Sequence, residues 1–230
     1  MPKTIARGKF ISFEGLDGCG KTTQMEKLVA SLRSEGIEVL TTREPGGTDI
    51  GERIRSVLLD SRTAGLDRWA EMALMFASRA QLIAQMIEPA LKSGRWVLCD
   101  RFTDSTEAYQ GGGRQLGSEA VLELHRVLCR NLWPDLTILM DSDVTYSVQR
   151  ARRRNTLAAP DGAPDENRFE RESKAFFTRV HETYLKIAER EKQRVVLIDA
   201  RRSIEDVHVD IVRTVGERLM GQTKAPVSTQ

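Results

Sequence analysis

The segment FEGLDGCGKTT spans Phe13 to Thr23, and its residues 15–22 match the pattern GxxxxGK[ST]. A chance match is expected roughly 0.006 times in a chain of this composition. The apolar run before it, residues 9–15, is typical of a buried strand, and a helical pattern follows it as far as Gly36. A glycine-rich turn between a strand and a helix directs backbone N–H groups inward, and the helix N-terminus adds its positive dipole end. The segment therefore predicts a cradle for the phosphates of a nucleotide.

The side chains of this loop match the chemistry of bound ATP. We expect Lys21 to reach the β- and γ-phosphates and Thr22 to bind Mg²⁺. A glycine turn with an incidental lysine is the alternative, but it leaves the flanking strand and helix unexplained. The residues expected to bind ATP are Gly15, Leu16, Asp17, Gly18, Cys19, Gly20, Lys21, Thr22 and Thr23.

Short apolar runs and longer helical patterns alternate along the rest of the chain. The other runs rich in β-branched residues are 37–43, 95–100, 135–141 and 194–200. This alternation predicts an α/β fold in which helices cover both faces of a five-stranded parallel sheet, the three-layer arrangement of P-loop NTPases. Ligands are expected at the carboxyl ends of the strands.

One segment interrupts this alternation. Three arginines at 152–154 precede NTLAAPDGAPDEN, which contains two prolines and a glycine. We interpret residues 150–168 as a mobile lid within a single P-loop domain, residues 1–220, and residues 221–230 as a disordered tail.

Composition narrows the class of partner. The chain has 35 Lys and Arg against 33 Asp and Glu, a net charge of +2, which gives no reason to expect nucleic acid or an anionic membrane as a partner. No apolar run approaches the ~18 residues of a membrane span, and the N-terminus has no signal-peptide core. Three cysteines without a CxxC pair are typical of reduced thiols. We therefore expect a cytoplasmic protein.

A carboxylate and a guanidinium follow the apolar run at 96–99. Asp100 at the end of this strand is expected beside the nucleotide's Mg²⁺, and Arg101 directly after it can bind an anion. An N-cap role for Asp100 is the simpler alternative. A basic residue next to a candidate metal ligand, at the carboxyl end of a strand, favours a catalytic site.

With these motifs the chain resembles the thymidylate kinases, which phosphorylate dTMP to dTDP with ATP for dTTP synthesis. The resemblance runs from about Lys9 to Met220. It is carried by FEGLDGCGKTTQ, by TREPGGT at 42–48, by CDRFTDSTEAYQGGGR at 99–114, and by QRARRR with RFERES within 149–173. It also implies a homodimer.

The resemblance implies a role for each matched position on the acceptor side. Asp17 would contact the sugar 3′-hydroxyl, Arg79 and Arg101 would clamp the dTMP phosphate, and Tyr109 would pack on the deoxyribose. The residues so assigned to dTMP are Asp17, Glu44, Pro45, Phe76, Arg79, Arg101, Thr106, Tyr109 and Gln110. Thr106 and Gln110 fall at the thymine edge, and EPGG at 44–47 lines the monophosphate side.

Two departures from the family pattern bear on these roles. The family usually has a stacking aromatic residue four positions before Arg79, where this chain has Met75, and Phe76 comes one residue later; either could face the base. The lid is also longer than in many bacterial relatives.

The lid arginines are the expected source of catalytic positive charge. One subtype of the family has an arginine inside the loop at the position of Gly18 and a lid poor in basic residues, so this chain resembles the other subtype. Arg152 and Arg154 are then expected to stabilise the transition state together with Lys21, and Asp100 is expected to take part in catalysis beside Mg²⁺, whereas Arg150 is expected to be structural. A kinase for another monophosphate or for a nucleoside, and a P-loop switch without an acceptor, are the alternatives.

Overall fold

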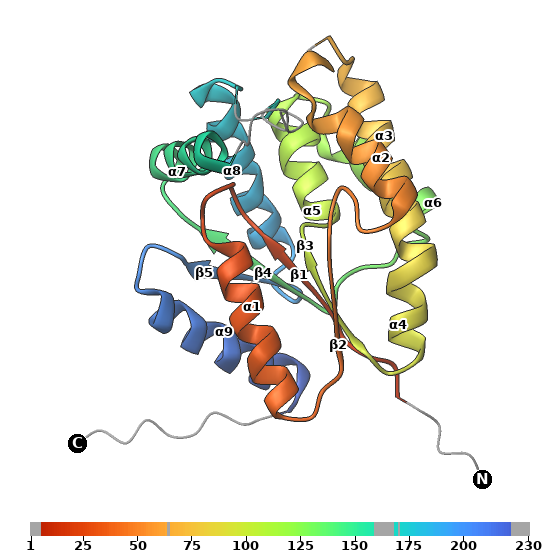
Figure 1. The fold of residues 1–230 in the computed structure, drawn as a ribbon, viewed down its shortest axis with the longest axis vertical. Coiled ribbons are helices and arrows are strands. Elements are labelled where there is room, and N and C mark those ends of the chain that lie inside the picture. The colour runs from red at the N-terminus through yellow and green to blue at the C-terminus, as the bar shows by residue number, and fades with distance from the viewer. Residues whose placement is uncertain (1–5, 64, 159–167, 170, 222–230) are drawn as a thin grey trace.

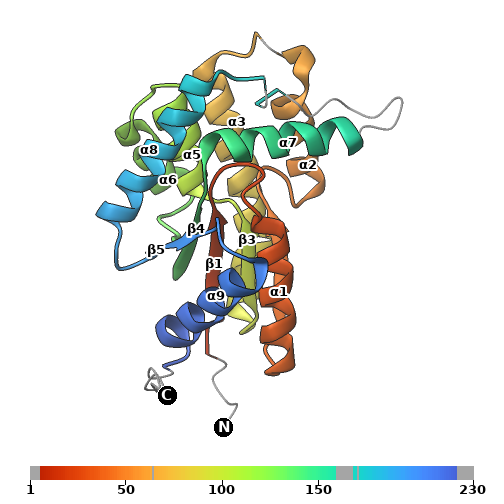
Figure 2. The same cartoon turned by 90° about the vertical axis from the view of Figure 1, so that its left-hand side faces the viewer.

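The computed structural model describes residues 6–63, 65–158, 168–169 and 171–221, without the side chains of 154–158. In this part of the chain, five parallel strands form one sheet in the order β2-β3-β1-β4-β5. Figures 1 and 2 show the sheet with helices on both sides, which confirms the predicted three-layer P-loop fold. The strands are β1 (Phe10–Glu14), β2 (Val39–Arg43), β3 (Trp96–Asp100), β4 (Leu136–Asp141) and β5 (Val195–Asp199).

The central strand β1 carries the sheet into the glycine loop. All five of its residues are buried, as expected for a strand with neighbours on both sides and helices on both faces. Phe13 pairs with Asp100 of β3 and Glu14 pairs with Leu139 of β4. The loop after β1 and the segment after β3 therefore leave the sheet side by side at its carboxyl edge.

Helices form the outer layers. The helical patterns of the sequence correspond to α1, to α3 with its continuation through η2 and α4, and to α6–α9. The helices α2, α5 and η3 add to these, the last being a π-helical turn. The helices are α1 (Lys21–Ser34), α2 (Asp49–Leu59), η1 (Ser61–Thr63), α3 (Arg68–Leu82), η2 (Ile83–Ile87), α4 (Glu88–Lys92), α5 (Thr103–Thr106), η3 (Glu107–Gly113), α6 (Ser118–Leu128), α7 (Val144–Ala158), α8 (Lys174–Arg190) and α9 (Ile204–Leu219).

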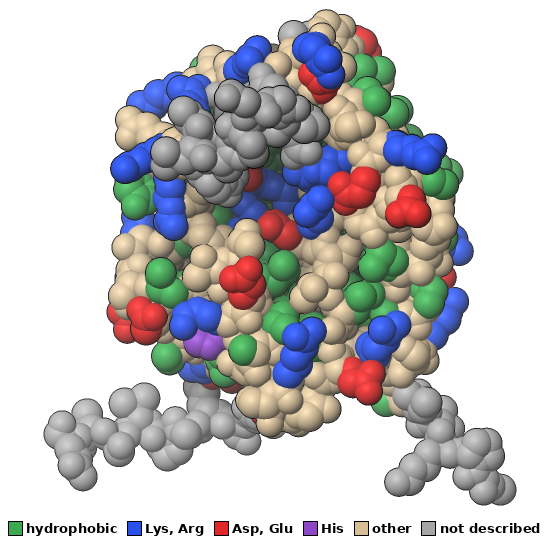
Figure 3. Space-filling view, in the orientation of Figure 1, with side chains coloured by type: hydrophobic (Ala, Val, Ile, Leu, Met, Phe, Trp, Pro, Cys, Tyr) green, Lys and Arg blue, Asp and Glu red, His purple; other side chains and the backbone are tan. Residues whose placement is uncertain are grey.

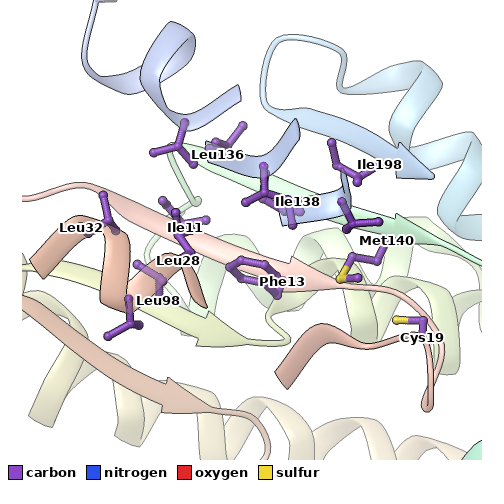
Figure 4. Packing of buried hydrophobic residues seen from close by; sticks show 14 residues of the cluster. Ile11, Phe13, Cys19, Leu28, Leu32, Leu98, Leu136, Ile138, Met140 and Ile198 are labelled. Carbon is purple, nitrogen blue, oxygen red and sulfur yellow. The ribbon is translucent and has the colours of Figure 1, made fainter. Parts of the chain in front are cut away.

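The two faces of the sheet bury separate cores. On one face, residues of β1, β3, β4 and β5 pack against α1 and α9, with Phe13, Leu28 and Ile211 at most 1% exposed. Figure 4 shows this cluster, which reaches the glycine loop at Cys19. On the other face, α3, α4 and α6 pack around Phe10 and Phe102. Alternation along β1 sends Phe10 to one core and Ile11 to the other.

The lid begins as a helix. α7 continues to Ala158, so the first part of the predicted lid is helical, and residues 159–167 lie outside the described residues. The helix expected from about Arg168 starts later, at Lys174, because the Ser173 hydroxyl caps it by accepting from Phe176 N at 3.2 Å. Of the expected tail, only Gly221 is described. Among the described residues no helix is both long and apolar enough to cross a membrane.

Candidate functional site

The glycine loop closes tightly over the start of α1. Gly15, Gly18 and Gly20 have φ values of 128°, 85° and 102°, which a residue with a Cβ rarely adopts. α1 then begins at Lys21, so its N-terminus opens into the loop. Lys21 is 6% exposed, and its Nζ donates to the carbonyls of Gly15 at 3.2 Å and Leu16 at 3.0 Å. The ammonium group thus lies inside the curve of the loop.

Gly18 is held against the lid helix. A Cβ at this position would lie 2.3 Å from Ser147 O and 3.1 Å from Ala151 N, both in the backbone of α7. The loop therefore has no room for a side chain at position 18 while α7 keeps its place. While α7 keeps this place, an arginine at position 18 could not be accommodated.

A cavity of about 530 Å³ opens beside the loop and suits a magnesium ion. Thr22 of α1 and Asp100 of β3 both line this cavity. Asp100 Oδ1 is buried and has no hydrogen-bond partner within the described part of the chain. A hydroxyl and a carboxylate oxygen are the ligand types that Mg²⁺ takes, usually with water and phosphate oxygens completing the set. The two residues present therefore fit the metal expected from the sequence.

A second cavity, of about 480 Å³, lies on the other side of the loop. Gly18, Cys19, Gly20 and Thr23 contribute to its lining. The segment between β5 and α9 closes it with Ala200, Arg201, Arg202 and Ser203, while α7 contributes Tyr146, Ser147 and Arg150. The sequence analysis did not assign the β5–α9 segment. Its signal was a basic pair directly after an apolar strand, at the sheet edge where ligands collect.

Cys19 is structurally inert in this loop. Its side chain is 6% exposed and belongs to the core beneath the loop. Burial raises the pKa of the thiol, outweighing the nearby positive charge of Lys21. Because the thiolate is the reactive form, the position of Cys19 gives no basis for redox chemistry.

Arg101 joins the glycine loop to the opposite wall of the site. Its backbone has a φ of 73°, a conformation that costs about 1–2 kcal/mol in a residue with a Cβ. Its Nη2 donates to Asp17 Oδ1 at 2.8 Å and to the Tyr109 hydroxyl at 3.2 Å. The guanidinium also lies over the Tyr109 ring, 4.9 Å from its centre. A strained backbone conformation at an arginine that lies between two sides of a site is typical of a residue that binds a ligand.

A buried carboxylate behind Arg101 fixes the geometry. Glu14 ends β1 with no exposure and accepts from Phe102 N at 2.7 Å and from the Ser105 hydroxyl at 2.5 Å. Tyr184 of α8 donates to the same carboxylate at 3.3 Å. Burial and the charge of Asp104 raise the pKa of Glu14 to about 8. The sequence analysis missed this residue, although a carboxylate closing the apolar strand FISFE was a visible signal.

Ser105 and Tyr184 connect this carboxylate to the guanidinium. Arg101 Nη1 donates to the Ser105 hydroxyl at 2.9 Å and to the Tyr184 hydroxyl at 3.2 Å. Both hydroxyls therefore contact Glu14 and Arg101 at once. Tyr184 belongs to α8, so this network ties α8 to Arg101 and to the end of β1.

Arg79 lies in a different environment from Arg101. Its side chain is 2% exposed, and its Nε donates to Glu44 Oε2 at 2.6 Å. Its Nη2 donates to the Thr106 hydroxyl at 2.8 Å. Nη1 and Glu44 Oε1 are both buried without a hydrogen-bond partner among the described residues. Among the described residues Arg79 and Arg101 thus have separate hydrogen-bond partners, and their joint clamp on a phosphate stays a prediction.

The structure also separates Met75 from Phe76. Phe76 has no exposed surface and packs in the core around Phe10 and Phe102, with the Arg79 guanidinium 4.9 Å from its ring centre. A ring buried on all sides has no face left for a base, so the expectation that Phe76 contacts the acceptor is corrected. Met75 is half-buried and packs with the cluster that contains Tyr109. Of the two side chains, only Met75 keeps some exposed surface and packs with this cluster.

Gln110 and Tyr109 come from the π-helical turn η3. Gln110 is 1% exposed, and its Nε2 donates to Glu71 Oε1 at 2.7 Å. The Tyr109 hydroxyl donates to Asp17 Oδ2 at 3.3 Å. Pro45 is buried, and the loop that contains it is held by Gly46 N, which donates to Ser78 Oγ at 3.0 Å. The predicted acceptor residues thus gather around the carboxyl end of β3.

The lid arginines are only partly described. Arg152 is exposed, and its Nη2 donates to Glu172 O at 3.1 Å, while the side chain of Arg154 lies outside the described residues. Arg150 lines the cavity beside Thr23, on the ATP side of the loop. Figure 3 shows Lys and Arg side chains gathered in a hollow near the start of α1. Basic side chains, Arg150 among them, therefore lie beside the glycine loop.

Comparison with known proteins gives one consistent result. The thymidylate kinase family model matches residues 13–211. The thymidylate kinase of Pelobacter propionicus is 44% identical over 216 residues, covering 94% of this chain and 97% of that protein. The thymidylate kinase of Trichlorobacter lovleyi is 48% identical over 191 residues, covering 83% of this chain and 89% of its own length.

A solved structure agrees with these sequence matches. The crystal structure of thymidylate kinase from Ehrlichia chaffeensis superimposes with a TM-score of 0.70 at 30% identity, covering 91% of this chain and 98% of the other. The residues matched by the family model, 13–211, include the glycine loop and α7. The chain therefore belongs to the thymidylate kinase family.

Proposed function

We propose that the chain transfers the γ-phosphoryl group of ATP to dTMP, giving dTDP and ADP for dTTP synthesis. Membership of the thymidylate kinase family supplies the reaction. The reaction is assigned to this site because Arg101 contacts both Asp17 of the ATP cradle and Tyr109 of η3. An anion bound there would lie between the two substrates, where a phosphoryl group must pass. We call the side of the site formed by α3, α5 and η3 the acceptor wall.

In this proposal Arg101 binds the acceptor phosphate. Its side chain is 14% exposed, which leaves room for an anion to reach it. Asp17 and Tyr109, which flank it, would contact the sugar, with Asp17 taking the 3′-hydroxyl. Glu44 and Pro45 line the neighbouring wall. A substrate phosphate is already ionised, so the reaction needs no strong general base and depends on positioning and charge.

We place the thymine base against the side chains between α3 and η3. Arg79 bonds Thr106, and we assign both to the base edge with Gln110, because within the described part of the chain the partners of Arg79 differ from those of Arg101. Met75 lies between these contacts and would pack against the ring. In this assignment Arg101 binds the phosphate and Arg79 contacts the base, whereas the family resemblance implied that both arginines clamp the phosphate.

The donor half of the site is the loop 15–23. Lys21 and the loop N–H groups would hold the ATP phosphates, and the cavity beside Thr23 would take the rest of the nucleotide. Thr22 and Asp100 would hold Mg²⁺, which neutralises phosphate charge when it is bound. Arg152 and Arg154 would approach the transferring group from the lid, residues 150–168. Gly18 supports this source because it leaves no room for a loop arginine.

We propose three further properties. The described elements share one sheet, which supports a single P-loop kinase domain over residues 1–220. The family resemblance supports a homodimer, which light scattering after gel filtration would test. The balanced charge and three unpaired cysteines support a cytoplasmic location.

The test is a comparison of acceptors. ADP production is measured with purified chain, ATP and Mg²⁺, adding dTMP, dUMP, UMP, CMP, AMP, GMP or thymidine in turn. We expect dTMP to give the highest kcat/KM. A higher value with another monophosphate, or with thymidine, would contradict the proposed substrate. ATP turnover unaffected by any acceptor would favour a P-loop switch.

A further inference from the structure

One face of α3 is bonded to the rest of the acceptor wall at two points. Glu71, Met75 and Arg79 are spaced four residues apart, so they lie along the same side of the helix. Glu71 accepts from Gln110 at 2.7 Å, and Arg79 donates to Thr106 at 2.8 Å. Met75 lies between these two bonds in the helix. Glu71 has no role in the site as described so far.

The bond to Glu71 fixes which end of the Gln110 amide faces away from α3. A glutamine side chain has a donor end and an acceptor end, whereas a carboxylate only accepts. Gln110 must therefore turn Nε2 toward Glu71, as the 2.7 Å contact shows. Its carbonyl oxygen Oε1 is then the atom left for a ligand. The two ends of an amide have nearly the same shape, so its orientation is set by the groups that hydrogen-bond to it.

Two arginines hold Glu71 in this acceptor role. Arg114 Nε donates to both carboxylate oxygens, at 3.1 and 3.2 Å, and Arg168 Nη2 lies 2.7 Å from Oε2. Glu71 has no exposed surface, so these cations balance a buried charge. Arg168 is itself fixed to Leu58 O through Nε at 2.5 Å, and Arg114 Nη1 donates to Glu172 at 2.5 Å. The carboxylate cannot easily rotate or be replaced by water.

We propose that Glu71 is a specificity-determining positioning residue for the base. By holding the amide, it presents Gln110 Oε1 as a fixed acceptor, which suits the N3–H donor of thymine. Cytosine carries a lone pair at N3, so two acceptors would face each other. The inference rests on the proposed function, in which Gln110 lies at the base edge. Part of the preference for a thymine over a cytosine nucleotide then originates in a residue that does not touch the substrate.

The substitution Glu71→Gln tests the orientation. A glutamine at position 71 can offer either a carbonyl or an N–H₂ group, so the Gln110 amide becomes free to turn over. The ratio of kcat/KM for dTMP to that for dCMP should narrow by about tenfold, the factor expected when one buried hydrogen-bond mismatch is relieved. Activity with dTMP should fall less than this, because Gln110 can still take its original orientation.

Glu172→Gln is the matched control. Glu172 also pairs with Arg114 but does not bond Gln110, so this variant weakens the same arginine without releasing the amide. Its dTMP to dCMP ratio should equal that of the unmodified chain. A merely structural role for Glu71 would lower the thermal midpoint of Glu71→Gln and leave the ratio unchanged, and that result would overturn the inference.

A third variant separates this inference from the proposed function. Gln110→Ala should also reduce the dTMP to dCMP ratio. If Gln110→Ala changes the ratio and a folded Glu71→Gln does not, then the role of Glu71 is wrong while Gln110 keeps its place at the base. If neither variant changes the ratio, the assignment of Gln110 to the base edge is wrong, and the inference falls with it.

The unmodified enzyme provides a check that does not depend on variant folding. N3-methyl-dTMP lacks the N3–H donor and is otherwise the same nucleotide. With a fixed acceptor at Gln110 Oε1, its kcat/KM should be at least about 100-fold below that of dTMP. Comparable turnover of the two nucleotides would overturn the proposal.

Discussion

The contact between Gly18 and the lid helix allows a quantitative test with Gly18→Ala. Gly18 has a φ of 85°, and a Cβ there would lie 2.3 Å from Ser147 O. Gly36 supplies a matched control, since its φ is 79° and a Cβ would meet nothing within 4 Å. Both alanine variants experience the left-handed strain, but only the variant at position 18 also meets the backbone of α7.

The expected stabilities follow from these two geometries. Left-handed strain costs about 1 kcal/mol in either variant. Overpacking against a backbone adds about 2 kcal/mol at position 18. For a domain of this size each kcal/mol lowers Tm by about 2–4 °C, so Gly36→Ala should lose about 2–4 °C and Gly18→Ala about 6–12 °C.

The kinetic effects should differ as well. α7 carries Arg152, and displacement of a catalytic group by about 1 Å can cost 100-fold in rate. We expect Gly18→Ala to lower kcat by roughly 10- to 100-fold while the KM for dTMP changes by less than about threefold. Gly36→Ala should leave both constants unchanged.

Thermal unfolding and steady-state ADP production measure these outcomes. Equal Tm losses in the two variants would show that α7 does not rest on Gly18. A Gly18→Ala variant with unchanged kcat would show that kcat does not depend on the position of α7. That result would refute the proposal that the catalytic arginines come from the lid.

Three further predictions concern charged residues of the site. Arg101→Ala should raise the KM for dTMP by roughly 100-fold, because about two charge-assisted bonds are lost, with the KM for ATP nearly unchanged; equal losses would count against a phosphate role. Asp100→Asn should raise the Mg²⁺ concentration for half-maximal activity by about tenfold or more without lowering Tm, and an unchanged Mg²⁺ requirement would argue against metal binding. The pKa of Glu14 is raised to about 8 in the folded chain from 4.5, so its contribution makes stability fall as pH rises between these values. Burial lowers the pKa of His125 to about 3 from 6.5, so this histidine makes stability rise with pH until about pH 7.5, opposite to Glu14. The free energy of urea unfolding should therefore be compared with that of Glu14→Gln, relative to which it should fall between pH 5 and 8. A difference between the two that does not change with pH would contradict the raised pKa of Glu14.

Local sequence signals were sufficient for the architecture. Buried strands in a parallel sheet are short, apolar and rich in β-branched residues, so periodicity located all five of them. The glycine loop is likewise a local device, because the φ values of Gly15 and Gly20 require the residue type that the motif specifies at those two positions. α5 and η3 have no comparable signal, since their polar residues are buried only by the elements around them.

The local sequence did not determine which side chains of α3 face the acceptor wall. Consecutive helical residues point about 100° apart, so the spacing before Arg79 allowed either Met75 or Phe76 to face the base. Packing of α3 against β3 and α6 turned Phe76 into the core and left Met75 beside Tyr109. The partners of Arg79 and Arg101 were set in the same way, by elements distant in sequence.

The buried carboxylates illustrate the limit most clearly. Glu14 and Glu71 are each satisfied by groups far away in the chain, among them Tyr184 and Arg168. A one-dimensional pattern reports which residues share a face of a helix or strand, and it therefore specified the sheet, the cradle and the candidate side chains. Hydrogen bonds between side chains depend on distances of a few ångströms between separate elements. Only the packed fold sets those distances, and with them the orientation of Arg101, the turn of the Gln110 amide and the fit of α7 against Gly18.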